Sequence, residues 1–200
     1  MLAVRKFIKN PLAVVISLAM GCCSNVGAFE TGPPPGHTGI QGESDCTACH
    51  FDNDANASGG GIELRGVPAN YVPGQNYSIS VNLLHEALSS GGFQLTIQDV
   101  NGASGGNFTG IRDDVKTIHV SDNDRRYIQH KQPRKKRDDD AGIQWTVVWT
   151  APDGNGDLIV AAAAVAANDD ASALGDYVYT KTIRVEPHGA ESTGEEKQKK

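Results

Sequence analysis

Residues 177–185 read Tyr-Val-Tyr-Thr-Lys-Thr-Ile-Arg-Val, and residues 77–81 read Tyr-Ser-Ile-Ser-Val. Apolar and polar side chains alternate along most of both segments. Because successive side chains of a β-strand point to opposite faces of the sheet, this alternation predicts strands with one buried face. The two segments therefore favour a sheet protein over a helical bundle.

Further short apolar segments follow at regular spacing, with turn signals at residues 72–74, 100–102 and 152–156. Residues 161–167 are rich in alanine and have helix propensity, but their polar flanks and the neighbouring strands favour a strand. About eight short strands with little helical pattern predict an all-β fold, an immunoglobulin-like antiparallel β-sandwich. The expected strands are Ile62–Arg65, Tyr77–Asn82, Gly92–Gln98, Val115–Val120, Tyr127–His130, Ile143–Thr150, Leu158–Ala167 and Tyr177–Val185.

The charge balance excludes some classes of function. The 200 residues include 24 acidic and 18 basic side chains, which gives a formal net charge of −6. A nucleic-acid-binding protein needs a basic face that offsets phosphate charge, so no nucleic-acid partner is expected. No Ser/His/Asp arrangement or pair of carboxylates in the sequence indicates a hydrolase.

Residues 1–28 have the three parts of a secretory signal peptide. A basic head within residues 5–9 precedes an apolar run at residues 11–23, and Val26 and Ala28 are the small residues of a cleavage site. The apolar run is shorter than the roughly 20 residues that span a bilayer, so no stable membrane span is expected after cleavage. The sequence therefore predicts a periplasmic or secreted protein.

Cleavage after Ala28 changes the composition of the chain. It removes three basic residues and no acidic ones, which leaves 172 residues with a net charge of −9, two cysteines and no methionine. A lipid-modified Cys22 is the alternative, although Ala19 occupies the position where a lipobox has a leucine-like residue.

The mature chain divides into three expected parts. Residues 29–61 are rich in proline and glycine and are expected to form an irregular N-terminal arm, with a flexible stretch at 52–61. Residues 62–186 contain the expected strands of the β-sandwich domain, interrupted at 131–140 by a charged and solvated loop. Residues 187–200 are predicted to be a disordered charged tail.

The arm contains the strongest chemical motif. Residues 46–50 read Cys-Thr-Ala-Cys-His, the attachment sequence of a c-type haem. We expect Cys46 and Cys49 to add to the two vinyl groups of haem c, and His50 to be the proximal iron ligand. A structural zinc site, a redox-active dithiol and a disulfide between the two cysteines are the alternatives.

The composition of the mature chain limits which residue could be the sixth iron ligand. A mature chain without methionine cannot supply the His/Met ligation of many electron-transfer cytochromes. An open sixth position, which would permit binding of small ligands, is one alternative. The candidate ligands are His37, His85, His119, His130 and His188.

Several segments in order resemble the choice-of-anchor V family of exported bacterial proteins, which is related to reeler-type domains. The matching segments lie between residues 36 and 185 and include Gly36-His-Thr-Gly39, Cys46–His50, Gly66–Gly74, Gly92–Thr96, Tyr127–His130, Trp149–Gly156, Ala166–Asn168 and Gly175–Thr180. The resemblance implies a reeler-like β-sandwich outside the cytoplasm, with the haem motif on its N-terminal arm. It also implies that His130, the last residue of an aromatic-x-x-His element, is the distal iron ligand, ahead of His37 and His119.

Together these patterns predict an exported monohaem c-type cytochrome that transfers one electron. The expected partner is an extracytoplasmic redox protein with a basic docking face, because the mature chain is strongly acidic. The alternative is an adhesion or binding module without a redox role. An enzyme or gas sensor with an open haem position is less favoured than an electron carrier or a binding protein.

Overall fold

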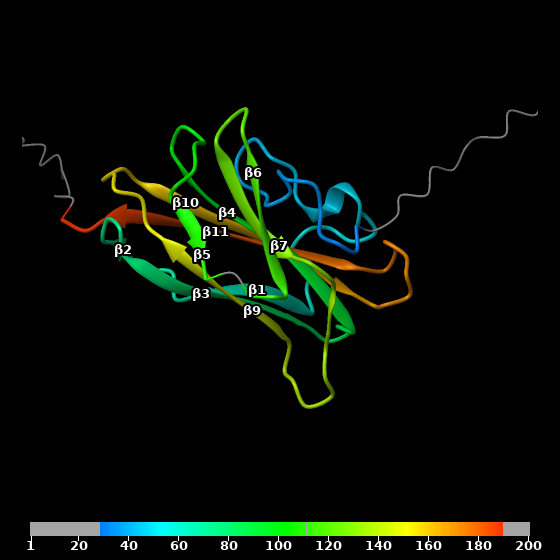
Figure 1. Ribbon diagram of the computed structural model, residues 1–200. Coiled ribbons are helices and arrows are strands. Elements are labelled where there is room, and N and C mark those ends of the chain that lie inside the picture. Colours follow the sequence, from blue (N-terminus) through cyan, green and yellow to red (C-terminus); the bar gives the residue numbers. More distant parts are fainter. Residues whose placement is uncertain (1–28, 111, 190–200) are drawn as a thin grey trace, which may run out of the picture.

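The computed structural model describes residues 29–110 and 112–189, so the signal peptide predicted for residues 1–28 and residues 190–200 of the predicted tail lie outside it. Two β-sheets face each other (Figure 1). The smaller sheet has the strand order β1-β3-β9-β5. Its strands are β1 (Gly60–Arg65), β3 (Asn76–His85), β9 (Ile143–Thr150) and β5 (Asn107–Thr109).

The larger sheet has the order β2-β11-β10-β4-β7-β6, and β8 pairs with the end of β4. Its pairs are antiparallel except that β2 runs parallel to β11. Its strands are β2 (Asn70–Tyr71), β4 (Ser90–Asp99), β6 (Val115–Val120), β7 (Arg125–His130), β8 (Arg134–Lys135), β10 (Leu158–Ala167) and β11 (Tyr177–Pro187).

The all-β sandwich predicted from the sequence is confirmed, and all eight expected strands are present. The alanine-rich segment is strand β10, as expected. Three short strands, β2, β5 and β8, were not predicted, because two or three residues cannot display an alternating pattern. Strand β8 lies within the charged segment 131–140, whose other residues are outside strands and, except for the half-buried Lys136, exposed.

The main hydrophobic core fills the space between the two sheets. Trp145 and Trp149 of β9 are almost completely buried there, and Trp145 packs against Phe93 with 4.9 Å between ring centroids. Trp149 donates its Nε1–H to the carbonyl of Gly105 at 2.8 Å. Aromatic side chains of this size contribute much of the apolar area that stabilises a sandwich.

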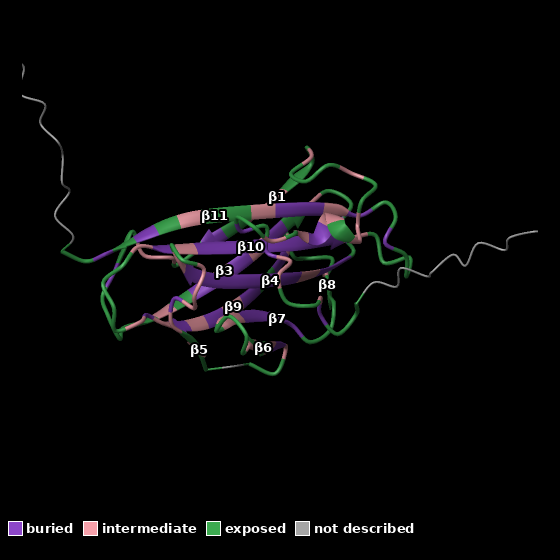
Figure 2. Ribbon diagram, turned by 90° about the horizontal axis from the view of Figure 1, so that it is seen from above, coloured by how far each residue is buried: buried purple, intermediate pink, exposed green. Residues whose placement is uncertain are grey.

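Strand β10 is buried on both of its faces (Figure 2). Ala162 and Ala164 face the main core, whereas Ala163 and Val165 belong to a second cluster that includes Cys46 of the arm. The arm therefore covers the outer face of the larger sheet. This cover explains why β10 is apolar throughout instead of alternating.

A buried carboxylate joins the arm to that sheet. The side chain of Glu43 is 3% exposed and accepts hydrogen bonds from Thr38 (2.9 Å), Gln98 (3.0 Å), Arg125 (3.1 Å) and Tyr127 (2.5 Å). Burial and the Glu43 carboxylate raise the pKa of Tyr127 well above its usual value. The phenol therefore remains a donor at any physiological pH.

The stretch 52–61, expected to be flexible, is held against β11. The backbone N–H of Asn56 donates to the carbonyl of Val178, and the Asn56 side chain exchanges hydrogen bonds with the backbone and hydroxyl of Thr180. Asn56 has φ of 61°, a left-handed conformation that asparagine adopts more readily than most residues. The arm is thus an ordered layer of turns.

Candidate functional site

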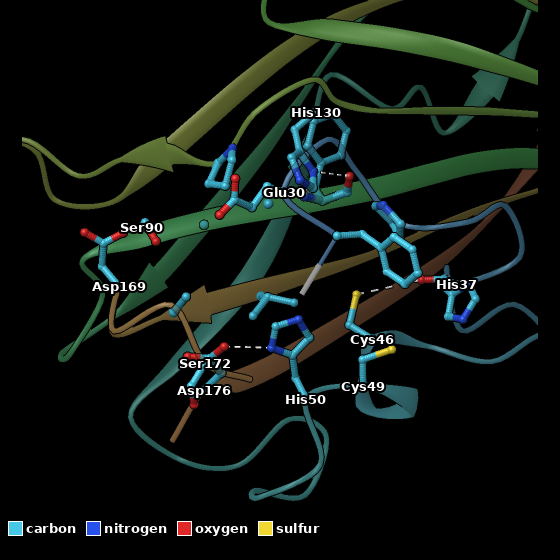
Figure 3. Close-up of a pocket in the computed structure, with 18 of the residues that line it drawn as sticks. Glu30, His37, Cys46, Cys49, His50, Ser90, His130, Asp169, Ser172 and Asp176 are labelled. Carbon is cyan, nitrogen blue, oxygen red and sulfur yellow. Dashed lines mark hydrogen bonds and ion pairs between the residues drawn. The ribbon is translucent and has the colours of Figure 1, made fainter. Parts of the chain in front are cut away.

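A cavity of about 290 Å³ lies between the arm and the outer face of the larger sheet. This volume is just below the roughly 300–1,000 Å³ of small-molecule and cofactor sites. Its walls are formed by the arm, by residues 90–93 of β4, by the ends of β7 and β10, and by residues 169–176. The four residues of the predicted haem site, Cys46, Cys49, His50 and His130, all line this cavity (Figure 3).

The two cysteines are placed by a short 3-10 turn, η1 (Cys46–Ala48). Asp45 begins the turn, and its carboxylate accepts the backbone N–H of Thr47 at 2.8 Å. The backbone N–H groups of Cys49 and His50 both donate to the carbonyl of Cys46, at 3.2 and 3.0 Å. This tight turn brings both thiols and the imidazole to one wall of the cavity.

Both cysteines are free thiols in the structure, and Cys46 is the more buried of the two. Burial, with smaller contributions from Asp45 and Cys49, raises the pKa of Cys46 to about 12. Cys46 is therefore protonated at neutral pH and is not a reactive thiolate in this closed arrangement.

His50 is oriented by a buried acid from the far end of the chain. Its Nδ1 lies 2.7 Å from Oδ2 of Asp176, whose side chain is 1% exposed. The other carboxylate oxygen accepts the backbone N–H of Asn168 at 3.2 Å. Since Nδ1 is occupied, Nε2 is the nitrogen of His50 that remains available to a ligand or metal.

His130 ends strand β7 on another wall of the cavity and is 6% exposed. In Figure 3 it lies across the cavity from His50. Its Nδ1 is 2.9 Å from the backbone nitrogen of Phe93 and 3.1 Å from the carbonyl oxygen of the same residue. The backbone N–H of Phe93 donates to Nδ1, and in this arrangement the proton of a neutral His130 is on Nε2. The other tautomer, in which Nδ1–H donates to the Phe93 carbonyl, frees the lone pair of Nε2 for a metal. Burial lowers the pKa of His130, which favours the neutral imidazole that a metal requires.

The ring of His130 rests directly on Gly92. A Cβ atom at this position would lie 2.4 Å from Cε1 and 2.7 Å from Nε2 of the ring. Any side chain larger than hydrogen at residue 92 would therefore displace His130.

The two alternatives to His130 that the resemblance left, His37 and His119, lie in different surroundings. His37 also lines the cavity, where its backbone N–H donates to Gln94 at 2.7 Å and its Nδ1 lies 3.1 Å from the carbonyl of Pro34. His119 lies on the exposed side of β6, does not line the cavity, and has its Nε2 2.8 Å from Asp124.

Asp176, Gly92 and Phe93 were not predicted as site residues. Nothing in the sequence connects Asp176 with His50, because 126 positions separate them. The sequence held one weak sign that the outer face of the larger sheet is covered. Gln94 and Gln129 are polar residues that directly follow apolar ones in β4 and β7. Both glutamines are fully buried and hydrogen-bonded to each other at 2.7 Å.

Metal-ligand clusters and membrane-spanning helices are both absent from residues 29–110 and 112–189. No three His, Cys, Asp or Glu side chains in these ranges are grouped so that they could hold a metal ion. No helix in the same part of the chain has the length and apolar character needed to cross a membrane.

Several solved structures are similar to this chain. The reelin-N domain of F-spondin has 18% sequence identity and a TM-score of 0.47, with 70% of this chain and 96% of that chain covered. A human F-spondin reeler domain has 19% identity and a TM-score of 0.44, with 66% and 93% covered. A cohesin module of a Clostridium perfringens glycoside hydrolase has 9% identity and a TM-score of 0.43, with 66% and 99% covered. No curated protein matches this sequence.

The two facing sheets define the class of the molecule as a β-sandwich. The family model of the Reeler domain matches residues 44–171, which is more than half of the chain. The chain belongs to the Reeler domain family, and the reeler-like part of the resemblance seen in the sequence is confirmed.

Proposed function

We propose that this chain is an exported reeler-domain protein that carries one covalently attached haem and transfers single electrons. The observation that supports this most is the convergence of Cys46, Cys49, His50 and His130 on one cavity. The first three come from the arm and His130 comes from β7, so the fold unites residues that are distant in sequence.

The donor set fits a c-type haem. The two free thiols precede a histidine whose Nδ1 is already bonded, and the second histidine is buried and has its pKa lowered. Each thiol would add across one vinyl group: a C–S bond forms, the thiol hydrogen moves to the neighbouring vinyl carbon, and nothing is released. When bound, haem supplies a one-electron Fe(III)/Fe(II) couple.

The chain itself would hold, orient and enclose the cofactor. Asp176 would hold Nδ1 of His50 and the backbone of Phe93 would hold Nδ1 of His130, which leaves Nε2 of each ring as the atom that would bind the haem iron. Bis-histidine ligation would give a lower potential than His/Met ligation, because a thioether ligand raises it.

Attachment of haem c outside the cytoplasm requires export, which agrees with the signal peptide predicted for residues 1–28 and with the family, whose domains are typically extracellular. The resemblance to the choice-of-anchor V family supports the same proposal. The electron donor and acceptor would be extracytoplasmic one-electron carriers. A basic docking face is proposed for the partner because the chain is acidic.

The test is expression in a bacterium with its cytochrome c maturation system, followed by intact mass and a pyridine haemochrome spectrum. We expect one haem per chain, no haem in the Cys46→Ala/Cys49→Ala variant, and a normal yield of both proteins. A correctly cleaved, folded and colourless wild-type protein without added mass would refute the proposal.

The second candidate is an extracellular binding module in which the Cys-x-x-Cys-His segment has no redox role. Membership of the Reeler family favours this function. The same haemochrome measurement separates the two, because a binding module without haem would leave the visible spectrum empty. If the Cys46→Ala/Cys49→Ala variant then keeps the wild-type fold, the result agrees with an extracellular binding module.

A further inference from the structure

Asp176 has an environment that an ordinary surface acid does not have. Its side chain is 1% exposed, and His50 is the partner that the structure gives it as an ion pair. Its second oxygen is bonded to the backbone of Asn168. A buried carboxylate is unfavourable unless positive charge or strong hydrogen bonds compensate for its lost hydration.

Residues 50–53 and 175–176 are joined by two more contacts. The side chain of Asn53 donates to the carbonyl of Asp176 at 2.9 Å, and the backbone N–H of Gly175 donates to Asp52 at 2.8 Å. The position of the Asp176 carboxylate relative to His50 is therefore fixed from both sides.

The two histidines that would bind the iron, His50 and His130, differ in what holds their Nδ1. Asp176 presents a carboxylate to Nδ1 of His50, whereas Nδ1 of His130 contacts the neutral backbone of Phe93, its N–H at 2.9 Å and its carbonyl at 3.1 Å. A charged acceptor makes the stronger hydrogen bond and raises the basicity of the imidazole more than a neutral one does. Asp176 therefore brings a negative charge to the His50 side of the cavity, and Phe93 brings none to the His130 side.

We propose that Asp176 is a positioning residue that holds the Nδ1–H of His50 and whose negative charge stabilises the oxidised state of the site. This inference rests on the proposed haem function. A ferric centre carries one more positive charge than a ferrous one, and in a poorly hydrated environment the nearby carboxylate favours that extra charge. Loss of the carboxylate charge therefore raises the midpoint potential.

The experiment compares Asp176→Asn with Asp169→Asn in the haem-loaded protein. The first variant removes the charge and keeps one acceptor oxygen for Nδ1–H of His50, at the expense of the hydrogen bond from the backbone N–H of Asn168. The second removes a carboxylate that also lines the cavity but is 39% exposed and bonded to Lys135. Potentials are measured by spectroelectrochemical titration with dithionite as reductant and ferricyanide as oxidant.

We expect Asp176→Asn to shift the ferrous-to-ferric ratio at a fixed potential about tenfold, which for one electron is about 59 mV upward. Asp169→Asn should shift it much less, because solvent and salt screen an exposed charge. Equal shifts in the two variants, or no shift in either, would overturn the inference while the haem function stands. A wild-type protein without haem would instead overturn the function itself.

A variant that loses haem is also informative. If Asp176→Asn does not retain haem, Asp176→Glu is measured, because it keeps the charge on a longer side chain. Retention of haem with a potential close to wild type supports the role of the charge. Equal loss of haem in both variants would show that Asp176 only shapes the fold, and would contradict the proposal.

Discussion

The contact between Gly92 and His130 allows the distal ligand to be removed without changing the ligand residue. A methyl group at residue 92 would begin 2.4 Å from the His130 ring, and the ring must move by about 1.0 Å to reach an ordinary contact of 3.4 Å. Axial ligation tolerates displacements of about 0.5 Å. We therefore expect Gly92→Ala to detach His130 and to open the sixth position.

The cost in stability follows from the same contact. Overpacking of this kind lowers the free energy of unfolding by about 1–3 kcal/mol, which in a domain of this size corresponds to about 2–12 °C in Tm. Gly91→Ala is the matched control. Its Cβ would lie 2.8 Å from Leu83 and 2.9 Å from the carbonyl of Val165, facing away from His130.

The assay is the visible spectrum of the reduced protein before and after addition of CO. Wild type and Gly91→Ala should keep low-spin bands and bind CO poorly, whereas Gly92→Ala should become high-spin and bind CO readily. If Gly92→Ala shows the bands and the CO response of the wild type, His130 is not the distal ligand and the reasoning is refuted.

Three further results are expected from other parts of the molecule. Glu43→Ala removes the buried partner of Arg125 and should lower the free energy of urea unfolding by about 3–5 kcal/mol. The control is Glu30→Ala, which removes an exposed carboxylate and should lower it by less than about 0.5 kcal/mol. In haem-free protein, burial keeps the pKa of His130 in the folded state below the ordinary 6.5. The neutral His130 therefore contributes fully to the stability of the fold above pH 6.5, and this contribution declines as the pH falls. The midpoint of urea unfolding should accordingly depend less on pH in His130→Gln than in the wild type. Ala163→Leu should displace the arm and speed its proteolysis, with a domain core that still resists cleavage.

The strands could be predicted because their pattern is local. Residues 177–185 alternate between apolar and polar side chains, and residues 143–150 are rich in β-branched and aromatic ones. Both patterns follow from one face of each strand packing on the core. Strand β10 was predicted from its flanks and its neighbours, although alanine favours helices. The reason for its uniform apolar composition lies in the arm, which no local pattern reveals.

The candidate site was predicted only in part. The Cys46-x-x-Cys49-His50 motif is local and was therefore visible, whereas His130 was suggested by family resemblance and not by its own surroundings. Asp176 and Gly92 were not found, because their roles depend on contacts across the fold. His37 was expected on an irregular arm, and Gln94 and Pro34 hold it in place at the cavity wall.

The covered face of β10 also has a consequence for the order of assembly. A chain is synthesised and exported from its N-terminus, so Cys46 and Cys49 emerge well before β10 and β11, against which the arm packs. Until those strands form, the arm has no surface to dock on, and both thiols remain open to solvent and to an attaching enzyme. Under the proposed function, the last strands to emerge would close the site over a haem that was already bound.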